Sequence, residues 1–296
     1  MALWKMSLGR VGRRWASHLD AAGRKAVRRV LERAKFELIP LKNVLDQAKF
    51  LPDGATVSVT ASPAKTLEDT MELAGELKQR GFDVIPHLSA RMVKDTAHLQ
   101  TLLEQMEAME VSRVFLVGGD AKEPGDFFDA YSVLQAMSDM GHHLTEIGVA
   151  SYPEGHHVIS DDKLRQALYD KQPYASYMTT QMCFDAAAIS RFVARARADG
   201  ITMPVHLGIP GVASRLKLIQ ISSRIGVGQS VSFLSKNRGL IKAFHNPGGY
   251  TPDELLDRLG ATLVDPVADI EGVHIYTFNQ CETTERWRQS YLEQLG

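Results

Sequence analysis

Short apolar runs alternate with longer amphipathic stretches along most of the chain. The short runs, rich in β-branched and aromatic residues, predict strands at 36–39, 55–60, 84–87, 113–117, 146–150, 175–180, 205–208 and 273–277. Between them, apolar residues recur at three- and four-residue spacing and predict helices at 67–80, 96–109, 126–140, 162–171, 185–199, 214–225 and 281–295. The chain therefore repeats a strand followed by a helix.

Strands that are each followed by a helix indicate parallel βαβ units, and eight of them predict a (β/α)8 TIM barrel. A doubly wound sheet is the alternative, but no G-x-G-x-x-G follows the first strand. The long interval between the last two strands predicts an insertion with a helix near 251–259. It also holds the Gly226-Val227-Gly228 loop, an apolar stretch at 231–233 and a turn at 246–249. Such an insertion lies at the face of the barrel where ligands bind.

Composition and charge separate the first 35 residues from the rest. Residues 1–35 carry ten basic and two acidic residues, a net charge of +8, whereas the whole chain carries −1. We expect a basic N-terminal helical extension over 1–35 and a single catalytic barrel over 36–296. The apolar spacing from 20 to 35 favours a helix packed on the barrel. A targeting segment or a helix that binds an anionic partner are the alternatives.

The composition excludes several classes of protein. Hydrophobic residues make up 44% and charged residues 23% of the 296 residues, as in ordinary globular proteins. We expect no membrane span, because no apolar run reaches 18 residues. Two cysteines fit a reducing compartment, and we expect a cytoplasmic protein.

Polar residues end most of the predicted strands, and in a barrel such positions open into the active-site mouth. They are Glu37, Thr60, His87, Asp120, Tyr152, Glu154, His156, Gln181, Tyr276 and Asn279. This mixture of acid, amide, imidazole and phenol groups suits a polar heterocyclic ligand. Some have structural alternatives: Glu37 could pair with a helix lysine, Asp120 could end a turn, and His87 could be a core histidine.

The sequence lacks the motifs of several other classes of enzyme. There is no G-x-S-x-G, Walker A, C-x-x-C or H-E-x-x-H motif. His156 and His157 are adjacent, so in an extended strand they would point to opposite faces. No partner set at ligand spacing accompanies them, and we predict no metal site.

Taken in order, the strand ends resemble the methylenetetrahydrofolate reductase family. The matching stretches are Phe36-Glu37 with Pro40, Ser58-Val59-Thr60, Pro86-His87-Leu88, Gly119-Asp120, Tyr152-Pro153-Glu154 with His156, Thr180-Gln181 with Phe184-Asp185, Gly208-Ile209-Pro210 and Tyr276-Thr277-Phe278-Asn279. Each piece alone is weak, but the ordered set spans nearly the whole predicted barrel.

The resemblance implies an oxidoreductase of one-carbon metabolism and methionine biosynthesis. It would reduce 5,10-methylenetetrahydrofolate to 5-methyltetrahydrofolate with NADH or NADPH as the hydride source. By resemblance, Glu37 corresponds to the general acid and Asp120 to the carboxylate near the pterin. The substrate-binding positions are Gln181, Tyr276 and Asn279, and the cofactor-binding positions are Thr60, His87, Gly119, Tyr152 and His156.

The positions that anchor FAD in ordinary members of that family differ in this chain. Gly118 replaces an arginine, and Tyr169 and Asp170 replace positively charged residues. Phosphate groups bind to positive donors, and an aspartate repels them. We therefore expect a reductase that binds FAD weakly or not at all, with hydride passing directly from the nicotinamide to the folate.

Two other functions fit the same barrel. One is a folate-dependent methyltransferase or demethylase, and the other is a non-catalytic folate-binding subunit. In each case we expect a reduced folate as the small-molecule partner, with no nucleic acid or membrane partner. We leave the oligomeric state open, because the basic helix of one subunit could pair with the acidic body of another in a homo-oligomer.

Overall fold

The computed structural model describes residues 19–62, 64–156, 158–214 and 250–296. In this part of the chain, parallel strands close into a barrel in sequence order from β1 to β8, and β8 pairs with β1. The strands are β1 (Lys35–Leu38), β2 (Thr56–Val59), β3 (Asp83–Ser89), β4 (Arg113–Val117), β5 (Glu146–Ser151), β6 (Tyr177–Thr180), β7 (Val205–Pro210) and β8 (Ile270–Tyr276). The predicted (β/α)8 barrel is confirmed.

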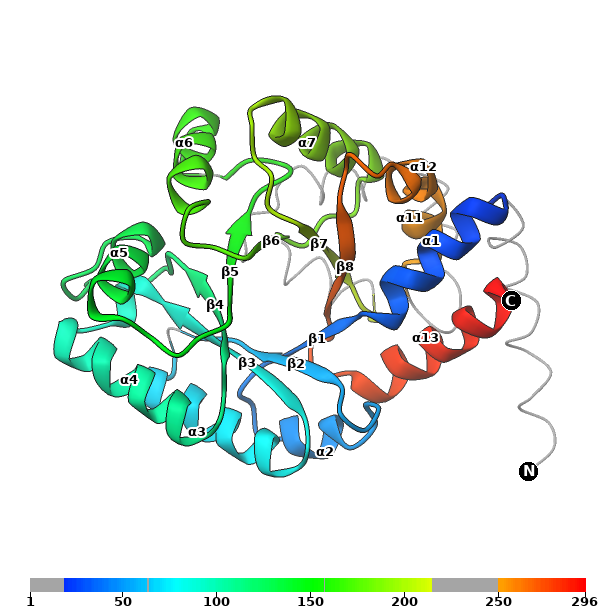
Figure 1. Cartoon of the computed structure of the whole chain (residues 1–296). Coiled ribbons are helices and arrows are strands. Elements are labelled where there is room, and N and C mark those ends of the chain that lie inside the picture. The colour runs from blue at the N-terminus through cyan, green and yellow to red at the C-terminus, as the bar shows by residue number, and fades with distance from the viewer. Residues whose placement is uncertain (1–18, 63, 157, 215–249) are drawn as a thin grey trace.

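Helices surround the strands (Figure 1). They are α1 (Ala21–Glu32), α2 (Val44–Ala48), α3 (Leu67–Gln79), α4 (Thr96–Ala108), α5 (Ala130–Met140), α6 (Asp161–Lys171), α7 (Ala186–Ala198), α11 (Asp253–Arg258), α12 (Gly260–Val264) and α13 (Cys281–Leu295), with a short 3₁₀ turn at Ala90–Met92. The predicted helix at 126–140 begins later, at Ala130, because the Asp129 side chain caps it. The predicted helix at 214–225, the glycine loop, the apolar stretch and the turn of the insertion lie essentially outside the described residues.

Side chains alternate between the barrel interior and the surrounding helices, as strand geometry requires. On β1, Phe36 and Leu38 belong to the apolar layer between strands and helices, and Glu37 contacts His274 across the interior. Inside the barrel, Ile85, Phe115 and Tyr177 form a separate small apolar cluster. We call the end of the interior beyond this cluster, where the strands end, the mouth, and the opposite end the floor.

The basic segment from 20 to 32 forms α1, whose N-terminus is capped by the Asp20 side chain. This helix packs against α12, α13 and β8, beside which it lies in Figure 1. Arg28 donates to the carbonyl of Leu292, and Arg29 donates to the carbonyl of Ile270. The prediction of a helix packed on the barrel is therefore confirmed for this segment, and these two arginines bind carbonyl groups of the protein itself.

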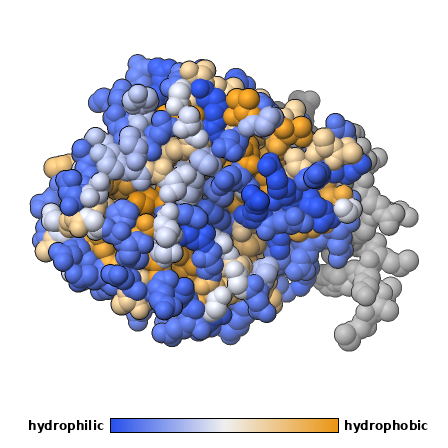
Figure 2. Space-filling view, in the orientation of Figure 1, coloured by the Kyte–Doolittle hydropathy of each residue, from blue (hydrophilic) through white to orange (hydrophobic). Residues whose placement is uncertain are grey.

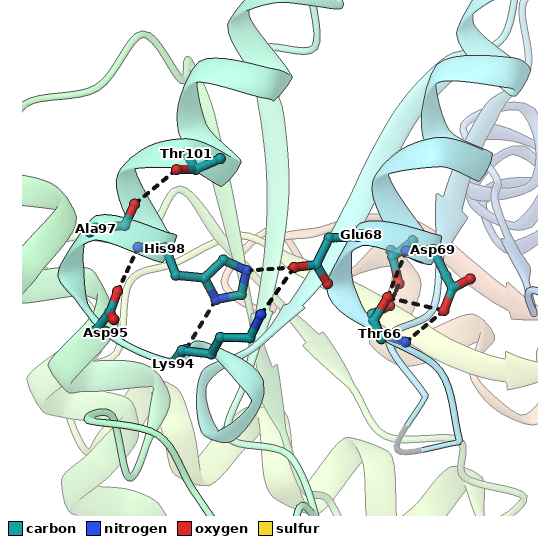
Figure 3. Close-up of polar contacts among 9 residues, drawn as sticks. Thr66, Glu68, Asp69, Lys94, Asp95, Ala97, His98 and Thr101 are labelled. Carbon is teal, nitrogen blue, oxygen red and sulfur yellow. Dashed lines mark hydrogen bonds and ion pairs between the residues drawn. The ribbon is translucent and has the colours of Figure 1, made fainter.

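Side-chain caps mark the starts of the neighbouring helices α3 and α4. Thr66 and Asp69 form a reciprocal capping box at the start of α3 (Figure 3). At the start of α4, Asp95 accepts a hydrogen bond from the backbone of His98. The Glu68 carboxylate lies 3.2 Å from the His98 ring and joins the two helix starts. Local capping therefore fixes where these helices begin relative to their strands.

The surface in Figure 2 is mostly hydrophilic over the outer faces of the helices, and hydrophobic residues show in the gaps between them. This is the distribution expected for helices that pack one face onto a barrel. No helix in the described part of the chain is long and apolar enough to cross a membrane.

Candidate active site

Glu37 occupies the mouth of the barrel, on β1 next to β8. Its side chain is 12% exposed, and its Oε2 lies 3.1 Å from Nε2 of His274. The hydroxyl of Thr277 donates to the Glu37 backbone carbonyl and fixes this part of β1 to the chain that follows β8. Glu37 therefore faces the interior and contacts a histidine rather than a lysine on a surrounding helix.

A buried imidazole and a phenol lie beside this pair. The His87 ring packs 4.8 Å from Phe115, between centroids, and its Nε2 is buried without a hydrogen-bond partner. Burial, with a smaller contribution from the neighbouring His274, lowers the pKa of His87 to about 3. Burial, followed by the charge of Glu37, raises the pKa of Tyr276 well above its ordinary value. Both rings are therefore neutral at physiological pH and offer hydrogen bonds without charge.

The end of β5 supplies a second group of side chains to the mouth. Tyr152 and His156 meet edge to face with their ring centroids 5.4 Å apart. Burial raises the pKa of Glu154 to about 7, with a smaller contribution from Asp185, and a contact with Cys183 opposes the shift. Glu154 is a carboxylic acid that changes charge near neutral pH, and residue spacing alone gave no sign of this.

Gly119 and Asp120 form the turn after β4. Gly119 has a φ of +86°, and a Cβ there would lie 1.8 Å from the Ser89 hydroxyl, so only glycine fits. Asp120 is exposed at this turn, and its charge raises the pKa of Tyr152 after the larger effect of burial. Asp120 and Tyr152 therefore lie close enough to interact across the mouth.

Gln181 and Asn279 already have partners within the protein. The Gln181 side-chain oxygen accepts from the backbone of Met182 at 2.8 Å. Asn279 accepts from the backbone N–H of Ile39 at 2.9 Å and donates to the Ile39 carbonyl at 2.8 Å. The structure thus gives Asn279 a bracing role between the ends of β1 and β8. Thr60, at the end of β2, is half-buried, and its backbone donates to Leu38.

A groove runs from the end of β5 between α6 and α7. Its lining includes Tyr152 and Tyr169 together with four basic residues, Arg165, Lys171, Arg191 and Arg195. Asp170 is absent from this lining and accepts a hydrogen bond from Gln166 at 2.7 Å. The arginines of α7 are spaced four residues apart, which places them on one face of the helix. That spacing is visible in the sequence, although it was not used to locate the groove.

Glu37, His87 and His274 each place one oxygen or nitrogen atom within 4.8 Å of the others. The ligands of a tetrahedral zinc ion lie closer together, about 3.3 Å apart for bonds of about 2.0–2.1 Å. A metal ion here would require the three side chains to converge. As it stands, the cluster contains the hydrogen-bonded Glu37–His274 pair with the His87 ring beside it.

Comparison with known proteins identifies the family to which this arrangement belongs. A model of the methylenetetrahydrofolate reductase family matches residues 40–290. The chain belongs to that family. The matched range contains every site residue discussed above except Glu37, which lies just before it. The resemblance noted from the strand ends is thereby confirmed.

One curated relative and one solved structure illustrate how far individual similarities extend. A protein of Caenorhabditis elegans described as "Probable methylenetetrahydrofolate reductase (NADPH)" is 25% identical over 228 residues, which is 68% of this chain and 34% of that protein. The chain thus spans about a third of the length of this curated relative. A solved structure described as a "putative phosphonomutase" from Burkholderia cenocepacia J2315 has 14% identity and a TM-score of 0.41, over 75% of this chain and 99% of that chain. At that TM-score the likeness carries no argument.

Proposed function

We propose that this protein reduces 5,10-methylenetetrahydrofolate to 5-methyltetrahydrofolate with hydride taken directly from NADH or NADPH. Family membership supports a reductase that acts on a folate. The observation that carries the proposed reduction is the enclosed carboxyl of Glu37, which faces the mouth and is 12% exposed. A carboxylic acid that is shielded from water and held inside a binding site is suited to donate a proton to substrate.

The proposed reaction uses one proton and one hydride. Glu37 protonates N10 of the folate, and the bond between N10 and the methylene carbon breaks. The product is an N5-iminium cation, which the nearby Asp120 carboxylate would stabilise as its charge develops. Hydride from the nicotinamide then adds to the methylene carbon and forms the N5-methyl group. The oxidised nicotinamide and 5-methyltetrahydrofolate leave, so atoms and charge balance.

The remaining mouth residues have binding roles in this proposal. Gln181 and Tyr276 contact the pterin, and Asn279 maintains the Glu37 strand through its bonds to Ile39. Thr60, His87, Gly119, Tyr152 and His156 would line the space for the nicotinamide. We place the dinucleotide phosphates in the groove between α6 and α7, whose lining includes Arg191 and Arg195 beside Asp161 and Asp199.

The positions that the family resemblance assigns to FAD do not fit that cofactor. Gly118 has no side chain, and Tyr169 is 57% exposed without a positive group. Asp170 carries a negative charge and is bonded to Gln166. None of the three can donate to a pyrophosphate as a basic residue does. We therefore route no step of the reaction through a flavin.

Kinetics and a spectrum of the purified protein test this proposal. Direct transfer requires both substrates to be bound together, so initial rates of NADH or NADPH oxidation with methylenetetrahydrofolate should give intersecting lines. A flavin shuttle would give parallel lines, and stoichiometric flavin absorption in the purified protein would falsify direct transfer. Comparing NADH with NADPH under the same conditions identifies the donor.

The Glu37→Gln variant separates reduction from the other candidate functions. It should lower turnover by about 10²–10⁴-fold, the usual contribution of a general acid, while folate binding stays within about tenfold. A methyltransferase or a folate-binding subunit does not need an acid at N10. Unchanged turnover in this variant would remove Glu37 from the mechanism.

A further inference from the structure

His274 lies inside the barrel, where sequence motifs assigned no role to it. It is 3% exposed, and its Nε2 is 3.1 Å from Oε2 of Glu37. The contact joins β8 to β1, which are paired in parallel with Glu37 opposite Tyr276. When Nε2 carries the proton, His274 donates to the carboxylate. When Glu37 carries it, the donor and acceptor exchange roles.

The other titratable groups around His274 do not exchange protons near neutral pH. The Glu37–His274 pair is therefore the place for a mobile proton. The titratable residues that face the His274 ring are Glu37 of β1, His87 of β3, His206 of β7 and Tyr276 of β8. Burial lowers the pKa of His87 to about 3 and that of His206 to about 2, so both are neutral near pH 7. Burial keeps Tyr276 protonated. None of these three exchanges a proton in the neutral range.

Apolar and aromatic contacts enclose the pair. Phe115 stacks against His274 with centroids 6.2 Å apart and an interplanar angle of 27°. The Tyr276 ring meets His274 edge to face at 5.0 Å. A charge-separated or hydrogen-bonded pair in such surroundings is less screened than a pair at the surface. Interacting groups of this kind titrate as a unit, and the proton they share belongs to the pair rather than to one residue.

We propose that His274 is the positioning residue that keeps the proton on the Glu37–His274 pair until Glu37 delivers it to the folate. This inference rests on the proposed function. In the resting enzyme the pair holds one mobile proton and has no net charge. After Glu37 gives the proton to N10, the pair is a carboxylate hydrogen-bonded to a neutral imidazole, and its negative charge faces the new iminium cation. A proton from solvent restores the pair after product leaves.

The pH dependence of turnover distinguishes this role from a merely structural one. Without His274 there is no pair to hold the proton, so the alkaline limb of the kcat profile should move to lower pH. We expect His274→Gln to lose about tenfold or more of the wild-type kcat near pH 8 and less than about threefold near pH 6, with a smaller change in KM. An equal loss at both pH values would overturn the proposal.

His206 provides the matched control, because it is also a buried barrel histidine that faces a glutamate. It lies at the floor, and its Nε2 is 3.5 Å from Glu271. The His206→Gln variant should follow the wild-type kcat profile at both pH values. A shift of the same size in His206→Gln would show that any buried histidine change has this effect, and would overturn the assignment to His274.

A second measurement does not require the His274 variant to fold or the enzyme to turn over. In the wild-type protein and in Glu37→Gln, the pH at which the His274 ring resonances change is measured by NMR. Removing the carboxylate should move that pH downwards by about one unit or more, and an unchanged value would overturn the pairing. Stoichiometric zinc in the purified protein would overturn it as well. Absence of wild-type reduction would contradict the proposed function, while the NMR result still decides the pairing.

Discussion

The two ends of the barrel interior each contain a histidine that faces a glutamate, yet their surroundings differ. At the mouth, the His274 and Glu37 side chains are 4% and 12% exposed and lie 3.1 Å apart. At the floor, His206 is equally enclosed, but Glu271 is 45% exposed and lies 3.5 Å away. Water can reach Glu271 directly and screen its charge. The comparison shows that enclosure of the carboxyl group, rather than the residue types, distinguishes the mouth pair from the floor pair.

The floor also differs in how its charges are compensated. The Lys35 ammonium group lies 3.6 Å above the centre of the Tyr177 ring, and Glu146 and Glu271 act on it electrostatically. Arg113 forms ion pairs with Asp83 and with Glu146. The floor charges therefore neutralise one another, as structural charges do. At the mouth, the His87 Nε2 atom is buried and unpaired, which suits a site that completes its hydrogen bonds with a ligand.

The largest expected effect on stability comes from substituting two glycines. Each leaves room for a tyrosine ring, one towards the mouth and one towards the floor. A Cβ on Gly208, towards the mouth, would lie 2.0 Å from the Thr180 backbone carbonyl and 2.9 Å from the Tyr276 ring. A Cβ on Gly148, towards the floor, would meet the outer atoms of the Tyr177 ring at 2.3–2.6 Å. Backbone cannot move aside as a side chain can. Gly208→Ala should therefore destabilise the protein by about 3 kcal/mol or more, and Gly148→Ala by less.

Chemical denaturation of both variants measures these changes in the free energy of unfolding. Gly118→Ala is the control, because nothing lies within 4 Å of its Cβ position and it should change stability little. A larger loss in Gly148→Ala than in Gly208→Ala would show that the Tyr177 packing at the floor is the more rigid of the two.

At the floor, removing the Lys35 charge should stabilise the protein. Burial is the main cause that lowers the pKa of Lys35 from 10.5 to about 8. The pKa of Lys35 is lower in the folded than in the unfolded protein. The stability linked to its neutral form is therefore fully present above the unfolded-state pKa of 10.5 and is lost as pH falls through about 8. A lowering of that size corresponds to roughly 3 kcal/mol, and the contact with Tyr177 returns about 1 kcal/mol. Lys35→Met should therefore gain about 2 kcal/mol at pH 7.

Denaturation at pH 7 and near pH 10 checks this expectation, because the gain should shrink as the wild-type lysine loses its proton. The exposed Lys163→Met is the matched control and should leave stability nearly unchanged at both pH values. Turnover should stay at the wild-type value in both variants. A destabilised Lys35→Met would mean that the ion pairs of the floor outweigh the burial of the charge.

The opposite sign of pH dependence is expected at the mouth, for Glu154. Burial raises its pKa from 4.5 to about 7, so the stability that its neutral form contributes is present below 4.5 and is lost as pH rises through 7. The side chain is partly open to water, and the effect is discounted for screening to about 1 kcal/mol. Glu154→Gln should be more stable than the wild type by that amount at pH 8 and equal to it at pH 4. The exposed Glu123→Gln should show no such difference, and a constant offset at both pH values would contradict the titration of Glu154.

Much of the fold and part of the site could be predicted from the sequence. Strand and helix periods are local, so the alternation that defines the barrel could be predicted. The direction of Glu37 was not, because it depends on the pairing of β1 with β8. The bonds between Asn279 and Ile39 join residues 240 positions apart and leave no local pattern.

His274 was missed for a related reason. It stands in the apolar run of β8, between Val273 and Ile275, and reads there as a core residue. Strand alternation places Gly272, His274 and Tyr276 on one face, and Tyr276 was already assigned to the mouth. The shared face with Tyr276 was the feature of the sequence that could have identified His274 as a residue of the mouth. The contact with Glu37 that gives His274 its chemistry depends on how β1 and β8 are brought together, which only the closed barrel provides.

The smallest expected effect on stability is at Gly118, beside the mouth turn. Nothing lies within 4 Å of its Cβ position and its backbone is not left-handed, so Gly118→Arg should change the free energy of unfolding by no more than about 0.5 kcal/mol. An arginine there would supply a positive donor near the end of β4, and one charged hydrogen bond of about 1.4 kcal/mol would raise FAD affinity about tenfold. Titration with FAD, followed by its fluorescence, measures the change against Gly118→Gln, which adds bulk without charge. Equal FAD affinities in the two variants would show that a positive charge at position 118 does not strengthen flavin binding, and that Tyr169 and Asp170 are the positions to change next.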